Sequence, residues 1–149
     1  MVEAGRDSRA IDEAIPMDPW LILSTGAALI FFVATGLNAV RYRVKHKIAA
    51  PAMHGHPEVE RALRVQGNTL EWLVVFVPSL WMFGIYFDGR IAAVVTAIWI
   101  LGRFLYMRAY VREPLERRNG FLLQLAATAV LLFGAMGAAV WQMFVGGEV

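Results

Sequence analysis

The sequence predicts an all-α integral membrane protein, a bundle of four transmembrane helices in one domain. Of its 149 residues, 58% are hydrophobic and only 17% are charged, and the uncharged residues gather in four long apolar runs. Such a composition is too apolar for a soluble domain of this length. The chain has no cysteine, which excludes disulfides, zinc–thiolate sites and a cysteine nucleophile. Any thiol chemistry must therefore use the sulfur of a substrate.

Residues 1–17 are polar and net acidic, and they lack the apolar core of a signal peptide. We interpret them as an N-terminal arm, either disordered or a short surface helix, ahead of a single domain over residues 18–147. The first membrane helix has Asp18 as its N-cap and Pro19 at its first position. Its uncharged run over residues 20–40 is long enough to cross about 30 Å of hydrocarbon.

A loop over residues 48–57 carries two prolines, a glycine and two histidines. The next helices are expected over about 58–87 and 90–112, joined by a tight turn at Asp88-Gly89, and a fourth helix is expected to begin near Pro114. The His54-Gly-His56 sequence is interpreted as exposed loop, because no other ligand accompanies it, and no metal site is predicted.

Basic residues predict the orientation in the membrane. Eleven lie toward one end of the four helices: Arg41, Arg43, Lys45, Lys47, Arg61, Arg64, Arg103, Arg108, Arg112, Arg117 and Arg118. The other three lie toward the opposite end: Arg6, Arg9 and Arg90. The positive-inside rule places the larger group in the cytoplasm, with both termini outside it. The compact loops favour a bacterial inner membrane, with the endoplasmic reticulum as the alternative, and topology explains the positive charge without a nucleic-acid partner.

Residues 60–71, ERALRVQGNTLE, place polar side chains at the mouth of an apolar run. On a helix, Arg64, Asn68 and Glu71 lie within about 60° of one another and form one polar face. Gln66 lies about 200° from Arg64. It is either a solvated interface residue or part of a site made with a neighbouring subunit, whose crevice Arg41 would also approach.

On the third helix, Arg103, Tyr106 and Tyr110 also share a face, and a rise of about 1.5 Å per residue puts them at the same depth as Asn68 and Glu71. An unpaired arginine in hydrocarbon costs at least about 2.5–3.5 kcal/mol, so Arg103 is expected to pair with Glu71. The pair either only locks the helix hairpin or belongs to a site that also takes an anionic ligand.

The segment ERALRVQGNTLEW, followed by GRFLYMRAY and then Arg117, resembles the MAPEG superfamily of membrane proteins in eicosanoid and glutathione metabolism, over about residues 18–145. The resemblance implies a homotrimer of four-helix subunits that binds glutathione between subunits near the cytosolic face. It implies an enzyme that conjugates glutathione to a lipophilic electrophile from the surrounding lipid, or reduces that electrophile. The alternative is a non-catalytic member of the family that binds lipid or glutathione.

The resemblance also assigns residues. Those that match glutathione contacts within one subunit are Arg64, Asn68, Glu71, Tyr106 and Tyr110. Gln66 matches a contact from the neighbouring subunit, as does Arg41, less directly, and Arg103 matches a structural or catalytic arginine of the prostaglandin synthase branch. Trp72 stands where the leukotriene branch has a tyrosine, so the indole N–H replaces that hydroxyl contact or the contact is lost.

Arg117 matches the arginine proposed to activate the glutathione thiol. Tyr110 is the alternative hydrogen-bond donor to the sulfur. Arg118 follows directly in the sequence, which leaves open which of the two guanidinium groups faces the thiol.

Overall fold

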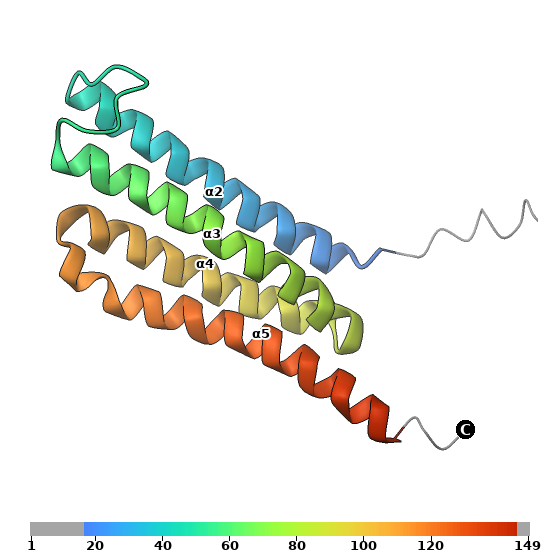
Figure 1. Cartoon of the computed structure of the whole chain (residues 1–149). Coiled ribbons are helices and arrows are strands. Elements are labelled where there is room, and N and C mark those ends of the chain that lie inside the picture. Colours follow the sequence, from blue (N-terminus) through green and yellow to red (C-terminus); the bar gives the residue numbers. More distant parts are fainter. Residues whose placement is uncertain (1–16, 146–149) are drawn as a thin grey trace, which may run out of the picture.

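The computed structural model describes residues 17–145 and shows four long helices packed side by side in an antiparallel bundle (Figure 1). The elements are α2 (Pro19–Lys45), α3 (Pro57–Tyr86), α4 (Gly89–Arg112), the short 3₁₀ helix η1 (Pro114–Arg117) and α5 (Arg118–Val145). All four α-helices are long and apolar enough to cross a membrane, and the described part of the chain has no strand. The predicted all-α class and the four transmembrane helices are confirmed. The predicted N-terminal arm, except Met17, lies outside the described residues.

Side-chain caps begin the helices where the sequence predicts. Asp18 Oδ1 accepts a hydrogen bond from Trp20 N at 2.8 Å, and Asp88 Oδ1 accepts one from Arg90 N at 2.6 Å. Helix α2 continues beyond its apolar run to Lys45. Lysine and arginine are good helix formers and are favoured at a helix C-terminus, so the basic residues extend the helix.

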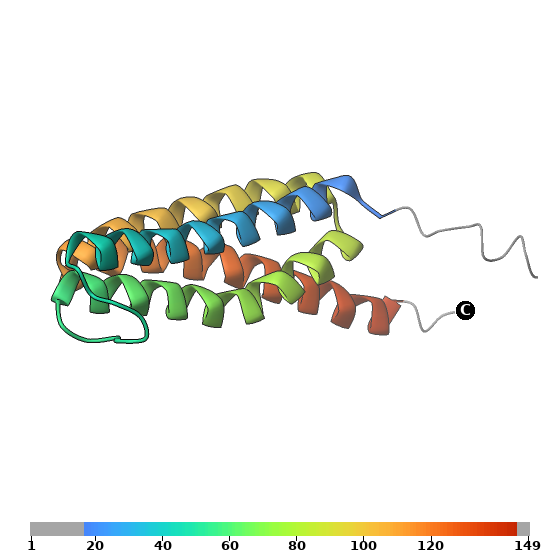
Figure 2. The same ribbon diagram turned by 90° about the horizontal axis from the view of Figure 1, so that it is seen from above.

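Helices α3 and α4 each contact the three other long helices, while α2 and α5 lie on opposite flanks of this central pair. Figure 2 shows α2 beside α4 and α3 beside α5 when the bundle is seen from above. The main apolar core includes Phe76 and Trp99, whose rings stack with centres 4.2 Å apart. Many large apolar side chains point outward instead, as expected for a surface that contacts lipid.

The C-terminal ends of α2 and α4 and the N-terminal ends of α3 and α5 lie at the same end of the bundle (Figure 1). At this end Arg61 of α3 donates hydrogen bonds to the carbonyl oxygens of Val111 and Arg112, at 3.3 and 2.8 Å. These carbonyls have no N–H partner within α4, because they belong to its last turn. Arg61 therefore ties the start of α3 to the end of α4.

Helices α4 and α5 approach each other through two glycines. A Cβ atom at Gly102 would lie 2.7 Å from the backbone nitrogen of Gln124, and one at Gly120 would overlap the backbone of Tyr106. Small residues allow helices in a membrane to approach closely. This contact brings Gln124 of α5 next to the polar face of α4.

Candidate functional site

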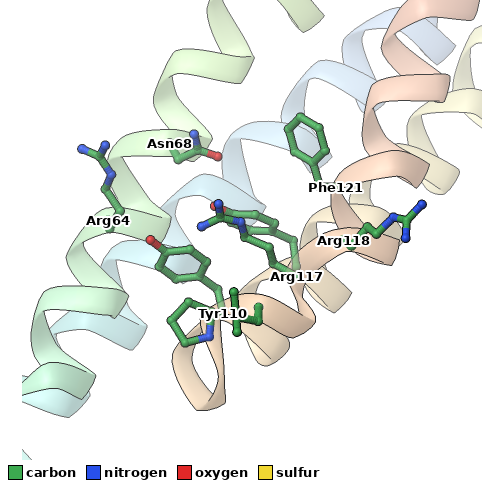
Figure 3. Close-up of a pocket in the computed structure, with 9 residues that line it drawn as sticks. Arg64, Asn68, Tyr110, Arg117, Arg118 and Phe121 are labelled. Carbon is green, nitrogen blue, oxygen red and sulfur yellow. The ribbon is translucent and has the colours of Figure 1, made fainter.

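A pocket of about 440 Å³ opens at the basic end of the bundle, between α3, α4 and the turn from η1 into α5 (Figure 3). Its lining residues are Arg64, Asn68, Tyr106, Tyr110, Pro114, Leu115, Arg117, Arg118 and Phe121. One chain thus brings together five of the predicted site residues: Arg64, Asn68, Tyr106, Tyr110 and Arg117. The volume lies in the range of small-molecule sites.

Local sequence places these side chains. Arg64 and Asn68 are one turn apart on α3, and Tyr106 and Tyr110 are one turn apart on α4. Pro114 ends α4, since proline cannot continue the helical hydrogen-bond pattern and restricts the residue before it. The chain then turns through η1, not through a first turn of α5 as the sequence predicts, and Arg117 is the last residue of this 3₁₀ helix.

Four side chains form a stacked column along one side of the pocket. The guanidinium carbon of Arg103 lies 4.7 Å from the ring centre of Tyr106, whose ring lies 5.4 Å from that of Tyr110. The guanidinium carbon of Arg117 lies 5.1 Å from the ring centre of Tyr110. Cations are attracted to the face of an aromatic ring. The column therefore holds Arg117 and both tyrosines in fixed relative positions before any ligand binds.

The prediction that Arg103 pairs with Glu71 is wrong. Arg103 is completely buried and donates to Gln124 Oε1 at 2.6 Å, to Asn68 Oδ1 at 3.2 Å and to the hydroxyl of Thr69. These neutral acceptors surround the guanidinium, whereas the Glu71 residue is exposed on the outer side of α3. Buried arginines are tolerated when their donors are paired. Both terminal nitrogens of Arg103 bond to amide, hydroxyl and backbone oxygens in place of a carboxylate, while its Nε has no hydrogen-bond partner among the described residues.

Gln124 is a site-supporting residue that the sequence-based prediction missed. It is completely buried and accepts the shorter of the two hydrogen bonds from Arg103 Nη1. The available signal was a single amide in the apolar run LLQLAATAV of the last helix. Polar residues in such a run commonly hydrogen-bond to another helix.

Glu71 lies outside the pocket, but it is linked to it through Asn68. Asn68 Nδ2 donates to Glu71 Oε2 at 3.3 Å. Glu71 lines a second, smaller pocket next to Asn68, together with Met53 and His54 of the loop. Arg64 and Asn68 line both openings, so the two adjoin along one edge of α3.

Three predicted contact residues lie elsewhere on this chain. Gln66 is half-buried and lies against α2, where a Cβ atom at Gly36 would be 3.1 Å from its Nε2. Arg41 is exposed and lines a separate opening on α2. Trp72 packs edge-on against Phe121, with ring centres 5.9 Å apart, behind the pocket wall.

Arg117 and Arg118 point in different directions. The guanidinium of Arg117 lies over Tyr110 in the middle of the pocket, whereas that of Arg118 extends away from Tyr110 and Asn68 (Figure 3). Among the residues that the structure describes, no acidic side chain lines this pocket. Its electrostatic character therefore favours an anionic ligand, and the Arg117 guanidinium lies over the Tyr110 ring.

A histidine cluster lies at the same end of the bundle. His46, His56 and Glu58 place three potential metal ligands within 4.8 Å of one another, while His54 is 90% exposed. The rings of His46 and His56 are stacked at 3.4 Å and nearly parallel, at 14°. Imidazole lone pairs lie in the ring plane, so stacked rings cannot both direct them at one ion without rotating. The Glu58 carboxylate instead holds Lys45 Nζ at 2.7 Å and His46 Nε2 at 2.5 Å, which ties α2 to α3.

The model of the MAPEG family matches the chain over residues 21–137. Among individual proteins, the chain is 40% identical over 124 residues to an uncharacterized protein of Synechocystis, covering 83% of this chain and 90% of that protein.

Two mammalian enzymes are also similar. Human microsomal glutathione S-transferase 2 is 39% identical over 104 residues, which cover 69% of this chain and 71% of that protein. Leukotriene C4 synthase of the rat is 31% identical over 102 residues, covering 68% of this chain and 67% of that protein.

Proposed function

Since the chain belongs to the MAPEG family, we propose that it is a membrane-bound glutathione transferase that conjugates glutathione to lipophilic electrophiles, or reduces them. The observation that carries this proposal is the pocket without acidic lining residues in which Arg117 is stacked on Tyr110. The similarity to a microsomal glutathione S-transferase supports the choice of co-substrate.

Glutathione carries two carboxylates, one amine and one thiol, and the described residues offer a complement to one carboxylate, to the amine and to the thiol. Arg64, at the pocket edge, is suited to a carboxylate, because guanidinium groups bind carboxylates through paired hydrogen bonds. Glu71 accepts a hydrogen bond from the pocket-lining Asn68 and is suited to the amine. Asn68, between them, supplies an amide. Arg117 is left for the thiol.

The proposed role of Arg117 is to stabilise the thiolate. A free thiol has a pKa of about 8.5, so only a few per cent is ionised at neutral pH. Lowering that pKa by about two units requires roughly 2.7 kcal/mol of preferential interaction with the charged form. Arg117 also immediately precedes α5, and the positive end of a helix dipole favours an anion there. The Tyr110 hydroxyl is the second candidate donor to the sulfur.

The chemical step follows from the thiolate. The thiol proton is released to solvent, the sulfur attacks an electrophilic carbon, a C–S bond forms, and the leaving group departs with its bonding electrons. With a hydroperoxide instead, two glutathione molecules are oxidised to the disulfide while the hydroperoxide is reduced to an alcohol and water. In either case the apolar substrate enters from the lipid through the outward-facing side of the bundle.

We further propose that the site is completed by a neighbouring copy in a homotrimer. Gln66 and Arg41 lie away from the pocket lined by their own chain, so each is available to a pocket on another subunit. The basic end of the bundle is proposed to face the cytoplasm, under the positive-inside rule, and the membrane is proposed to be a bacterial inner membrane.

The test uses purified protein in detergent or lipid nanodiscs. Titration calorimetry with glutathione is expected to show binding, and conjugation of 1-chloro-2,4-dinitrobenzene is expected to require the protein. S-methylglutathione, which lacks the thiol, should compete for binding and give no product. Absence of glutathione binding would refute the proposal. Binding without turnover on any of several electrophile classes would leave a non-catalytic binding protein.

A further inference from the structure

A directed chain of hydrogen bonds crosses three helices below the pocket. Gln124 Oε1 on α5 accepts from Arg103 Nη1 on α4 at 2.6 Å. The same nitrogen donates to Asn68 Oδ1 on α3 at 3.2 Å, and Asn68 Nδ2 donates to Glu71 Oε2 at 3.3 Å. The chain leads from the interior of the bundle to the Glu71 carboxylate, which adjoins the pocket through Asn68.

The direction of each link is fixed by chemistry. A guanidinium has five donors and no acceptor, so Asn68 must present its oxygen to Arg103. Its NH₂ group then points the other way, toward Glu71. The orientation of the Asn68 amide, and with it the position of the Glu71 carboxylate, therefore depends on where Arg103 is held.

Arg103 is held from both sides. On the α3 side, Nη2 donates to the Val65 carbonyl at 3.4 Å and to the hydroxyl of Thr69. On the α5 side, Gln124 supplies the acceptor, and both Gln124 and Arg103 are completely buried. Water does not compete for these bonds, and an alternative position of the guanidinium would leave buried groups unpaired.

We propose that Gln124 is a positioning residue that, through Arg103 and Asn68, sets the affinity and selectivity of the site for ligands that carry a free amine. The inference rests on the proposed function, in which Glu71 receives the amine of glutathione. Arg117 lies over Tyr110 and is separated from Arg103 by the two stacked tyrosine rings, so its position does not depend directly on the hydrogen bond to Gln124. Loss of Gln124 should therefore weaken amine recognition and leave the thiol step intact.

The experiment compares glutathione with N-acetylglutathione, whose amine is neutralised as an amide. Dissociation constants for both are measured by calorimetry, and kcat and KM are measured with 1-chloro-2,4-dinitrobenzene. In Gln124→Met the Kd for glutathione is expected to rise about 3- to 10-fold, the change produced by the loss of one well-placed hydrogen bond, while the Kd for the acetylated analogue changes less than about twofold. The kcat should stay within about twofold of wild type.

Two further variants separate positioning from a general loss of structure. Gln124→Glu keeps an oxygen acceptor at the same reach and should keep the wild-type preference for the free amine. Thr128→Val, one turn along α5, removes a buried hydroxyl that bonds only to its own helix, and should leave both dissociation constants unchanged. Gln124→Asn shortens the side chain by one methylene, and we expect the same changes in the two dissociation constants as for Gln124→Met. It is used in place of Gln124→Met if the methionine variant does not fold.

An unchanged ratio of the two dissociation constants in Gln124→Met or Gln124→Asn, with glutathione still bound by wild type, would overturn this inference alone. A fall in kcat without a change in that ratio would also overturn it, because it would place Gln124 in the thiol step or in general stability. Absence of glutathione binding by wild type would overturn both this inference and the proposed function.

Discussion

The guanidinium carbon of Arg117 lies 5.1 Å from the centre of the Tyr110 ring. Tyr110 in turn stacks on Tyr106, and Tyr106 lies beside the buried Arg103. A long, flexible arginine loses side-chain entropy when it is fixed by a ligand. Here the aromatic column fixes Arg117 beforehand, so a bound anion gains the interaction at a lower entropic cost.

Arg117→Ala is expected to lower kcat near neutral pH at least about tenfold, because about one unit or more of thiol pKa shift would be lost. A cation lowers the pKa of the bound thiol, so the fraction of thiolate at pH 7 falls when the Arg117 guanidinium is removed. As the pH rises through about 8.5, where a free thiol ionises, the variant should recover toward wild type.

The measurement is kcat from about pH 6 to pH 9 with saturating glutathione, since that range brackets thiol ionisation. Arg118→Ala is the matched control, because its side chain points away from Tyr110 (Figure 3), and it should keep the wild-type profile. Parallel profiles for Arg117→Ala and wild type would remove Arg117 from thiolate stabilisation.

Tyr110→Phe keeps the ring under Arg117 and removes only the hydroxyl. If that hydroxyl donates to the thiolate, kcat should fall about 3- to 10-fold, as for the loss of one hydrogen bond to a charged group. Tyr86→Phe is the control, because Tyr86 lies at the C-terminal end of α3, away from the pocket, and its kcat should change less than about twofold. Equal kcat values for Tyr110→Phe and wild type would leave Arg117 as the sole candidate donor to the sulfur.

Arg103→Leu should lower the thermal stability of the protein in detergent by several degrees. The change leaves the side-chain oxygens of Gln124 and Asn68 without the donor that Arg103 supplies, and each such buried group costs about 1–3 kcal/mol. Arg108→Leu, on the same helix but exposed, should unfold within a degree or two of wild type. If Arg103→Leu unfolds at the wild-type temperature, the hydrogen bonds that Arg103 donates do not stabilise the folded protein.

Much of the fold was predictable, because hydrophobic run length, proline positions and cap residues are local properties of the sequence. Spacing on one helix also placed Arg64 beside Asn68, and Tyr106 beside Tyr110. The partner of Arg103 was not predictable in this way. Helical depth put Glu71 at the right level, but the choice between Glu71 and Gln124 depends on how α4 and α5 pack, which is a property of the glycine contact between them.

Gly120→Ala tests that contact. The added methyl group would overlap the backbone of Tyr106, which cannot move aside as a side chain can. Overpacking of this kind costs about 1–3 kcal/mol, and separation of α4 from α5 would also displace Tyr106 and the Arg103–Gln124 pair. The melting temperature and the affinity for glutathione should therefore fall together.

Gly137→Ala, on the same helix, is the matched control. A Cβ atom at Gly137 would meet no atom within 4 Å, so this variant should retain the wild-type melting temperature or exceed it slightly, because alanine favours helix. A Gly120→Ala protein as stable as Gly137→Ala would show that α4 and α5 have room to separate without consequence.

The proposed sharing of the site between subunits predicts complementation between two defective chains. Gln66→Ala and Arg117→Ala, each alone, should lower activity at low glutathione concentration. The two chains carry different affinity tags and are coexpressed, and oligomers that contain both are purified. If one subunit supplies Arg117 and its neighbour supplies Gln66, every trimer that contains both chains has both residues intact at one of its three sites. The mixed oligomers should then exceed the mean activity of the two pure variants.

If both residues served one chain's pocket, no site would be intact and the activity would equal that mean. Gln66 lies against α2, on the face of α3 away from its own pocket, which is the geometry that favours recovery.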